Sequence, residues 1–173
     1  MRLVLDSSVL IATLKAEEPG HADARTFVAR LQETQAAGEA RAFAPPELWL
    51  EVYVAEQRLA RARGGKKPVL LHHAARERST GAGAPELDAM RGLTVELVAP
   101  ADLEAVTSFL ELLTRRTRGR RPSANATDLV YLWAAASVEA TVVTFDEGLL
   151  EYHGAVCDVT RPQHVRFSGA RPA

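Results

Sequence analysis

The chain has 173 residues, of which 47% are hydrophobic and 25% are charged, and its formal net charge is −1. This size and composition are typical of one globular domain, and a charge near zero excludes a general electrostatic attraction to nucleic acid or membranes. The one cysteine, Cys157, excludes an internal disulfide. No apolar run is long enough to span a bilayer, and no signal peptide is evident. We therefore expect a cytoplasmic protein that does not insert into membranes.

An apolar run at positions 3–5 predicts the first strand, which ends in the carboxylate of Asp6. Unbroken hydrophobicity is typical of a strand that is buried on both faces, as in parallel sheets. Because ligands of open α/β sheets bind at the carboxyl ends of the strands, Asp6 is a candidate site residue. The alternative is that Asp6 caps the helix that follows, a role that Ser7 or Ser8 would fill equally well.

A helix, a short strand and a second helix are expected next. Apolar residues at helical spacing predict the first helix over 21–35, and the strand follows over 41–44. Two prolines then begin a helix that runs to about Arg61. Glu51 lies at the border of its apolar stripe, whereas Glu47 lies further round. A border glutamate is commonly a half-buried surface residue, so Glu51 alone does not indicate a site.

A region rich in glycine, positions 64–92, predicts an inserted loop or arm. A strand over 94–98 and a helix that opens at Pro100 follow it. Five arginines end this helix: Arg115, Arg116, Arg118, Arg120 and Arg121. Such a run commonly lies in solvent at the negative end of a helix dipole, or else it contacts phosphates. Its position directly before the next acidic segment favours the second role.

Two more acids lie in the last third of the chain. The segment 123–138 is apolar nearly all round, which indicates a buried central helix. Asp128 lies in its first turns, and a carboxylate among apolar residues requires a cation or a hydrogen-bond donor. Like the first strand, the strand predicted over 141–145 is apolar and is followed by an acid, Asp146. Because side chains alternate along a strand, Thr144 and Asp146 lie on one face.

The order of the elements predicts a three-layer α/β/α fold with a mostly parallel central sheet of four to five strands. A last strand over 155–159 completes a single domain, residues 1–160, and residues 161–173 form an edge segment and a tail. In such a sheet Asp6 and Asp146 converge on one edge.

Glu51 and Asp128 would join them from two helices, so that four carboxylates share one cleft. Like charges about 4 Å apart repel by roughly 4 kcal/mol at an effective dielectric constant near 20, so the group must be protonated or hold cations. Oxygen ligands favour Mg²⁺ or Mn²⁺ over zinc. This arrangement suits the attack of a metal-activated water on a phosphodiester.

Four segments together resemble a PIN domain, and most of all the VapC-type ribonuclease toxins of prokaryotic toxin–antitoxin pairs. The segments are Leu3-Val4-Leu5-Asp6-Ser7-Ser8 with Val9-Leu10-Ile11, Pro45-Pro46-Glu47-Leu48-Trp49-Leu50-Glu51-Val52, Ala126-Thr127-Asp128-Leu129-Val130-Tyr131 and Val142-Val143-Thr144-Phe145-Asp146. The resemblance covers roughly residues 2–159.

This resemblance implies a metal-dependent endoribonuclease that is usually a homodimer. Its acidic metal-binding set would be Asp6, Glu51, Asp128 and Asp146, with supporting hydrogen bonds from Thr144 and from Ser7 or Ser8. A small antitoxin protein would insert a peptide over the cleft and block it. The region 64–92 is longer than the compact toxins need and would serve as a dimer arm, an RNA clamp or an antitoxin surface. The choice of Glu51 over Glu47 depends on helical phase and on the distance from Pro45.

Two other classes of protein are alternatives to the RNA-cleaving enzyme. A PIN-like module that binds RNA or a protein without cleavage would be favoured by the loss of an acid, and all four acids are present. A phosphoacceptor receiver would carry paired acids after its first strand. An aspartyl phosphatase would carry a second Asp two residues after the first, where this chain has Ser8. The last two are therefore poor matches.

Overall fold

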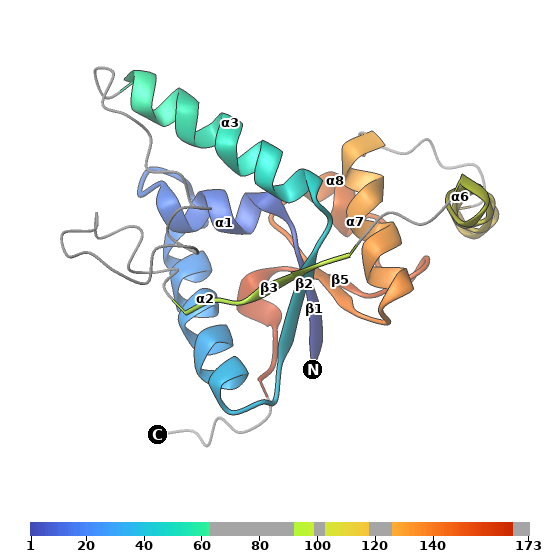
Figure 1. The fold of residues 1–173 in the computed structure, drawn as a ribbon, viewed down its shortest axis with the longest axis horizontal. Helices are drawn as coiled ribbons and strands as arrows, with labels where there is room; N and C mark the ends of the chain where they lie inside the picture. The colour runs from blue at the N-terminus through green and yellow to red at the C-terminus, as the bar shows by residue number, and fades with distance from the viewer. Residues whose placement is uncertain (63–91, 99–102, 118–125, 168–173) are drawn as a thin grey trace.

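Five parallel strands form the central sheet of the protein in a computed structural model that describes residues 1–62, 92–98, 103–117 and 126–167 (Figure 1). The strands are β1 (Arg2–Leu5), β2 (Arg41–Ala44), β3 (Val95–Leu97), β4 (Thr141–Val143) and β5 (Val159–Thr160), and their order in the sheet is β3-β2-β1-β4-β5. The central strand β1 pairs with β2 and with β4, so that Val4 lies opposite both Phe43 and Val142. The prediction of a mostly parallel sheet is confirmed.

Helices cover both faces of this sheet, which confirms the three-layer α/β/α prediction (Figure 1). The helices are α1 (Ser7–Leu14), α2 (His21–Ala36), α3 (Glu47–Ala62), α6 (Leu103–Thr117), α7 (Ala126–Ser137) and α8 (Glu147–Leu150), followed by a 3-10 helix, η1 (Pro162–His164). Helix α1 packs against α2 and α3, whereas α7 packs on β1, β2 and β4. The chain reverses its direction across the sheet between β3 and β4, and this reversal moves the later helices to the other face.

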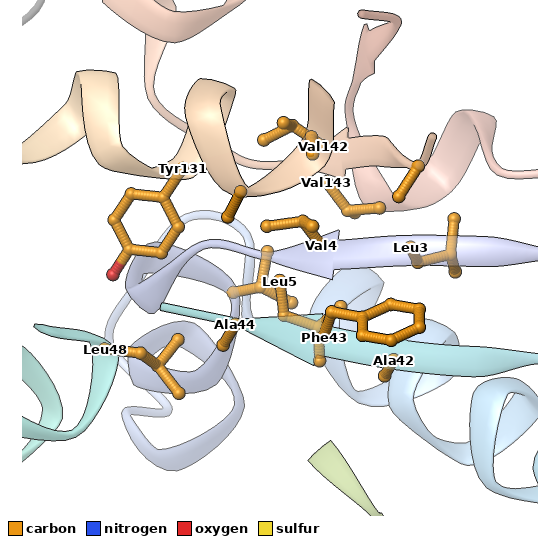
Figure 2. Packing of buried hydrophobic residues seen from close by; sticks show 14 of the residues in the cluster. Leu3, Val4, Leu5, Ala42, Phe43, Ala44, Leu48, Tyr131, Val142 and Val143 are labelled. Atoms are coloured by element: carbon orange, nitrogen blue, oxygen red, sulfur yellow. The ribbon is translucent and has the colours of Figure 1, made fainter. Parts of the chain in front are cut away.

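The hydrophobic core lies on both faces of β1, as the apolar run predicted. Leu3, Val4 and Leu5 are 2%, 0% and 0% exposed, and Figure 2 shows them between β2 and β4. Leu48 from α3 and Tyr131 from α7 close the core at the carboxyl end of the strands. Because the core continues to this end, it holds the starts of the helices that surround the candidate site.

Two strand ends differ from the prediction. Strand β4 ends at Val143, before Thr144, because the chain turns there and the Asp146 backbone N–H donates to the Thr144 hydroxyl at 2.8 Å. Strand β5 begins only at Val159, because Gly154 opens a turn with φ of +75° and its N–H donates to the carbonyl of Cys157. Side-chain and backbone bonds of this kind compete locally with the strand ladder.

Several predicted features lie outside the described residues. They include all but the last residue of the 64–92 region and the end of the tail from 168 onward. The described part of the final segment forms η1, which packs against α2, and the ring of Phe167 lies 5.8 Å from that of Phe27. Among the described helices, none combines the length and hydrophobicity needed to cross a bilayer.

We expect Leu48→Ala to lower the free energy of unfolding by about 2–5 kcal/mol, because Leu48 is 0% exposed and its truncation leaves a cavity. Urea unfolding would measure the loss. The matched control is Leu50→Ala in the same helix, where Leu50 is 69% exposed and a change within about 0.5 kcal/mol is expected. Equal losses for the two variants would contradict the described orientation of α3.

Candidate functional site

Asp6 lies in the junction between β1 and α1, at the carboxyl end of the sheet. Its backbone N–H donates to the Val143 carbonyl of β4 at 3.0 Å, and its own carbonyl accepts from the Val9 N–H. The residue occupies the N-cap position of α1, but its side chain makes no capping hydrogen bond. The carboxyl is therefore not used as a helix cap, although it is buried to 4% exposure.

Two hydroxyl groups hold the Asp6 carboxyl instead. The Thr144 hydroxyl donates to Asp6 Oδ2 at 2.7 Å, and the Ser8 hydroxyl donates to the same oxygen. Ser8 Oγ also accepts a hydrogen bond from the Phe145 backbone N–H at 3.0 Å. These bonds connect the end of β1 to the turn that follows β4, so the two strand ends form one unit.

Asp146 comes from the same turn, on the surface of the protein. It is the N-cap of α8, and its Oδ1 accepts from the Leu149 backbone N–H at 3.1 Å. The sequence prediction placed Asp146 on one face with Thr144, and the structure connects them through the Asp146 N–H. One side-chain oxygen of Asp146 is thus used in capping, whereas the residue itself is exposed.

Glu51 reaches the site from the second turn of α3 and is half-buried. Its Oε2 accepts a hydrogen bond from the Tyr131 hydroxyl of α7 at 2.6 Å. Glu47, the alternative acid, lies in the first turn of the same helix, where its Oε2 is buried and has no hydrogen-bond partner. The two glutamates therefore differ in that only Glu51 has a described donor.

Two of the predicted acids, Glu51 and Asp146, act electrostatically on a third, Asp6. Burial raises the pKa of Asp6 from its ordinary value of 3.8 to about 6, and the negative charges of Glu51 and Asp146 add to this increase. The hydrogen bonds from Ser8 and Thr144 act in the opposite direction and lower the pKa of Asp6. Glu51 and Asp146 are thus both close enough to Asp6 for their charges to disfavour its ionised form.

Asp128 lies in the first turn of α7 and is half-buried. Its charge acts on Tyr152, whose pKa is raised by burial, by Glu151 and by Asp128. Tyr152 follows α8 in the chain, so Asp128 lies where α7 packs against α8. Within the described residues, no three His, Cys, Asp or Glu side chains lie close enough together to hold a metal ion. Shared coordination by the four acids therefore stays a prediction.

Only part of the predicted arginine cluster lies within the described residues. Arg115 and Arg116 are exposed in the last turn of α6, and Arg115 forms an ion pair with Glu111 at 3.1 Å. Arg118, Arg120 and Arg121 lie outside the part of the chain that the structure describes. The role of the cluster in RNA binding therefore stays a prediction.

Tyr131 contacts one of the candidate acids, and no role in the site was predicted for it from the sequence. Its side chain is 0% exposed although its hydroxyl is bonded to a half-exposed carboxylate. The sequence does contain a pattern that points to Tyr131. It follows Asp128 by three positions and therefore lies on the same face of the helix as that candidate acid. A tyrosine in an otherwise apolar helix requires a partner for its hydroxyl, and the sequence alone does not identify that partner.

No protein-family model matches this chain, and no curated protein matches it. Among solved structures, the chain is similar to the crystal structure of PAE2754 from Pyrobaculum aerophilum, with 19% sequence identity and a TM-score of 0.42. The alignment covers 91% of this chain and 92% of that chain. A similarity at this level identifies neither a family nor a function for the protein.

We expect Asp6→Asn to stabilise the metal-free protein above about pH 7. The folded-state pKa of about 6 exceeds the ordinary 3.8, so between these values the folded state binds more protons and the wild type loses stability as the pH rises. Asn keeps an oxygen that can accept from the two hydroxyls, but it carries no charge. The free energy of unfolding should therefore rise by an amount on the order of 1–3 kcal/mol.

Urea unfolding of both proteins across this pH range would measure the gain. The difference between them should shrink as the pH falls to about 4, because the wild-type carboxyl is then protonated in the folded state. A difference that does not depend on pH would contradict the raised pKa of Asp6.

Proposed function

We propose that this protein is a metal-dependent endoribonuclease that hydrolyses RNA phosphodiester bonds with Mg²⁺ or Mn²⁺. The observation that carries the proposal is the buried Asp6 carboxyl at the carboxyl ends of β1 and β4, whose pKa is raised in part by the charges of Glu51 and Asp146. Such carboxylates destabilise one another unless a proton or a cation lies between them. A divalent cation would relieve this repulsion at neutral pH.

The donor atoms fit a hard cation in kind, because they are all oxygens. The proposed ligands are Asp6, Glu51, Asp128 and Asp146. Hydrogen bonds to Asp6 engage Oδ2 and the one to Glu51 engages Oε2, so Oδ1 and Oε1 are the atoms proposed to face the cation. No three such side chains are within reach of one ion among the described residues, so the proposal requires the side chains of Asp128 and Asp146 to change rotamer on binding. When bound, the cation would activate water and stabilise the leaving oxygen.

Ser8 and Thr144 would hold Asp6 in place during the reaction. Their hydroxyls lower the pKa of Asp6 and thereby favour the ionised form that a metal ion needs. Arg115 and Arg116 are exposed at the end of α6, and the proposal assigns them, with Arg118, Arg120 and Arg121, to the phosphates of the RNA backbone.

We further propose that the protein is the toxin of a toxin–antitoxin pair in the cytoplasm, acts as a homodimer and is inhibited by its cognate antitoxin. The support is the sequence resemblance together with a groove of about 380 Å³ between α1 and α3. Its apolar side chains are Ile11, Leu50, Val54 and Ala55, and its charged ones are Glu51 and Arg58. A peptide bound there would cover the carboxylate of Glu51.

The second candidate is a PIN-like module that binds RNA or protein without cleaving. The observation that favours it is the lack, within the described residues, of three acidic side chains at metal-binding distance from one another. A metal-binding experiment separates the two candidates without knowledge of the RNA substrate.

We expect Mn²⁺ or Mg²⁺ at millimolar concentration to raise the melting temperature of the wild type, because a ligand that binds only the folded state stabilises it. Asp6→Asn and Asp128→Asn should abolish the rise, since each removes a proposed ligand. The matched control is Glu33→Gln, an exposed acid near the end of α2, which should keep it.

No rise in the wild type would favour the binding module over the nuclease. A rise that survives both Asp substitutions would place the metal elsewhere in the protein. Where the rise depends on both acids, cleavage of RNA by the wild type and by Asp128→Asn should then be compared. Equal cleavage by the two proteins would refute the proposed role of Asp128.

A further inference from the structure

We propose that Tyr131 is a positioning residue of the candidate metal site, which holds the Glu51 carboxylate so that one of its oxygens faces Asp6. This inference rests on the proposed function, because positioning has a purpose only if Glu51 binds a cation. It extends that function by a residue that is neither acidic nor a proposed metal ligand.

The contact joins two elements that are far apart in the chain. The Tyr131 hydroxyl donates to Glu51 Oε2 at 2.6 Å, across 80 positions of sequence, from α7 to α3. Hydrogen bonds to an ionised carboxylate are shorter and stronger than those between neutral groups. The bond therefore connects α7 to α3 at the site.

The ring of Tyr131 is a rigid support for this hydroxyl. The residue is 0% exposed and belongs to the same core as Leu5 and Leu48. Figure 2 shows the ring extending from α7, with its hydroxyl oxygen toward α1. Glu51 is half-buried, so its carboxylate would otherwise sample several rotamers at the edge of the protein. The rigid donor thus restricts the flexible acceptor.

The Tyr131 hydroxyl also lies within the field of the other site residues. Its pKa is raised by burial, then by the charge of Asp6 and by the bond to Glu51, whereas the Ser7 side chain lowers it. Asp6, Ser7 and Glu51 all act on this one hydroxyl, and it lies at the junction of β1, α1 and α3.

A simpler interpretation is that Glu51 only satisfies a buried tyrosine hydroxyl. The two interpretations differ in what removal of the hydroxyl does. A structural bond affects the stability of the protein without metal, whereas a positioning bond affects metal affinity. Removal of hydrogen-bonding partners of metal ligands typically reduces metal affinity 10- to 100-fold.

The test is a Mn²⁺ titration in which free Mn²⁺ is measured by its electron paramagnetic resonance signal. It compares the wild type with Tyr131→Phe, Glu51→Ala and the double variant Tyr131→Phe/Glu51→Ala. Tyr53→Phe is the matched control, because Tyr53 is exposed on α3 and loses the same hydroxyl. Melting curves without metal show whether each variant folds.

We expect Tyr131→Phe to raise the Mn²⁺ dissociation constant about tenfold and Tyr53→Phe to leave it unchanged. In the Glu51→Ala background, Tyr131→Phe should have no further effect, because the group that it positions is absent. Should Tyr131→Phe fail to fold, Glu51→Asp tests the same bond from the other side. This change keeps the charge but is one methylene too short to reach Tyr131, and it should weaken binding to a similar extent.

Three results would overturn the inference. If the wild type binds Mn²⁺ and Tyr131→Phe binds it equally well, Tyr131 is not a positioning residue and the proposed function stands. If the loss persists unchanged in the Glu51→Ala background, Tyr131 does not act through Glu51. If the wild type itself binds no Mn²⁺, the proposed function fails and the inference fails with it.

Discussion

The pairing of β1 with β4 is the constraint on which the candidate site depends. Its last backbone bond, from the Asp6 N–H to the Val143 carbonyl, brings Asp6 next to the turn that contains Thr144. Ser8 then bonds to both sides of this junction, through Asp6 and through the Phe145 N–H. A shift in register by one residue would turn Asp6 away from Thr144, because alternate residues of a strand face opposite sides of the sheet. The buried apolar residues of β1 prevent such a shift, so the core also fixes the site.

The same junction places an unfavourable group in the protein interior. A carboxyl that is nearly inaccessible and close to two other acids is less stable when ionised, and two hydroxyls offset only part of that penalty. Natural proteins retain such local conflicts mainly where function requires them, and a conflict at the carboxyl edge of a parallel sheet lies where ligands usually bind. Asp6 was an ambiguous residue in the sequence because its position also suits a helix cap. The absent capping bond argues against the cap role alone, and the role of Asp6 in a metal site stays a prediction.

Much of the fold follows from patterns in the sequence, and the details of the site do not. The apolar run of β1 predicted burial on both faces because side chains alternate along a strand. The predicted end of β4 was wrong because the hydrogen bond from the Asp146 N–H to the Thr144 hydroxyl ends the strand early. The hydrophobicity of the segment does not reveal this bond. The bond between Tyr131 and Glu51 joins residues 80 positions apart and depends on how two helices are placed around the core. Periodicity within each helix says nothing about that placement.

The wide separation of the site residues along the chain has a consequence for synthesis. Asp6 and Thr144 are 138 positions apart, and the central strand β1 pairs first with β2, which is made long before β4. A ribosome that adds about 5–20 residues per second needs several seconds or more to make the intervening chain. Throughout that time the nascent chain lacks the turn that holds Asp6. A site built in this order cannot form on the ribosome before the turn after β4 has been made.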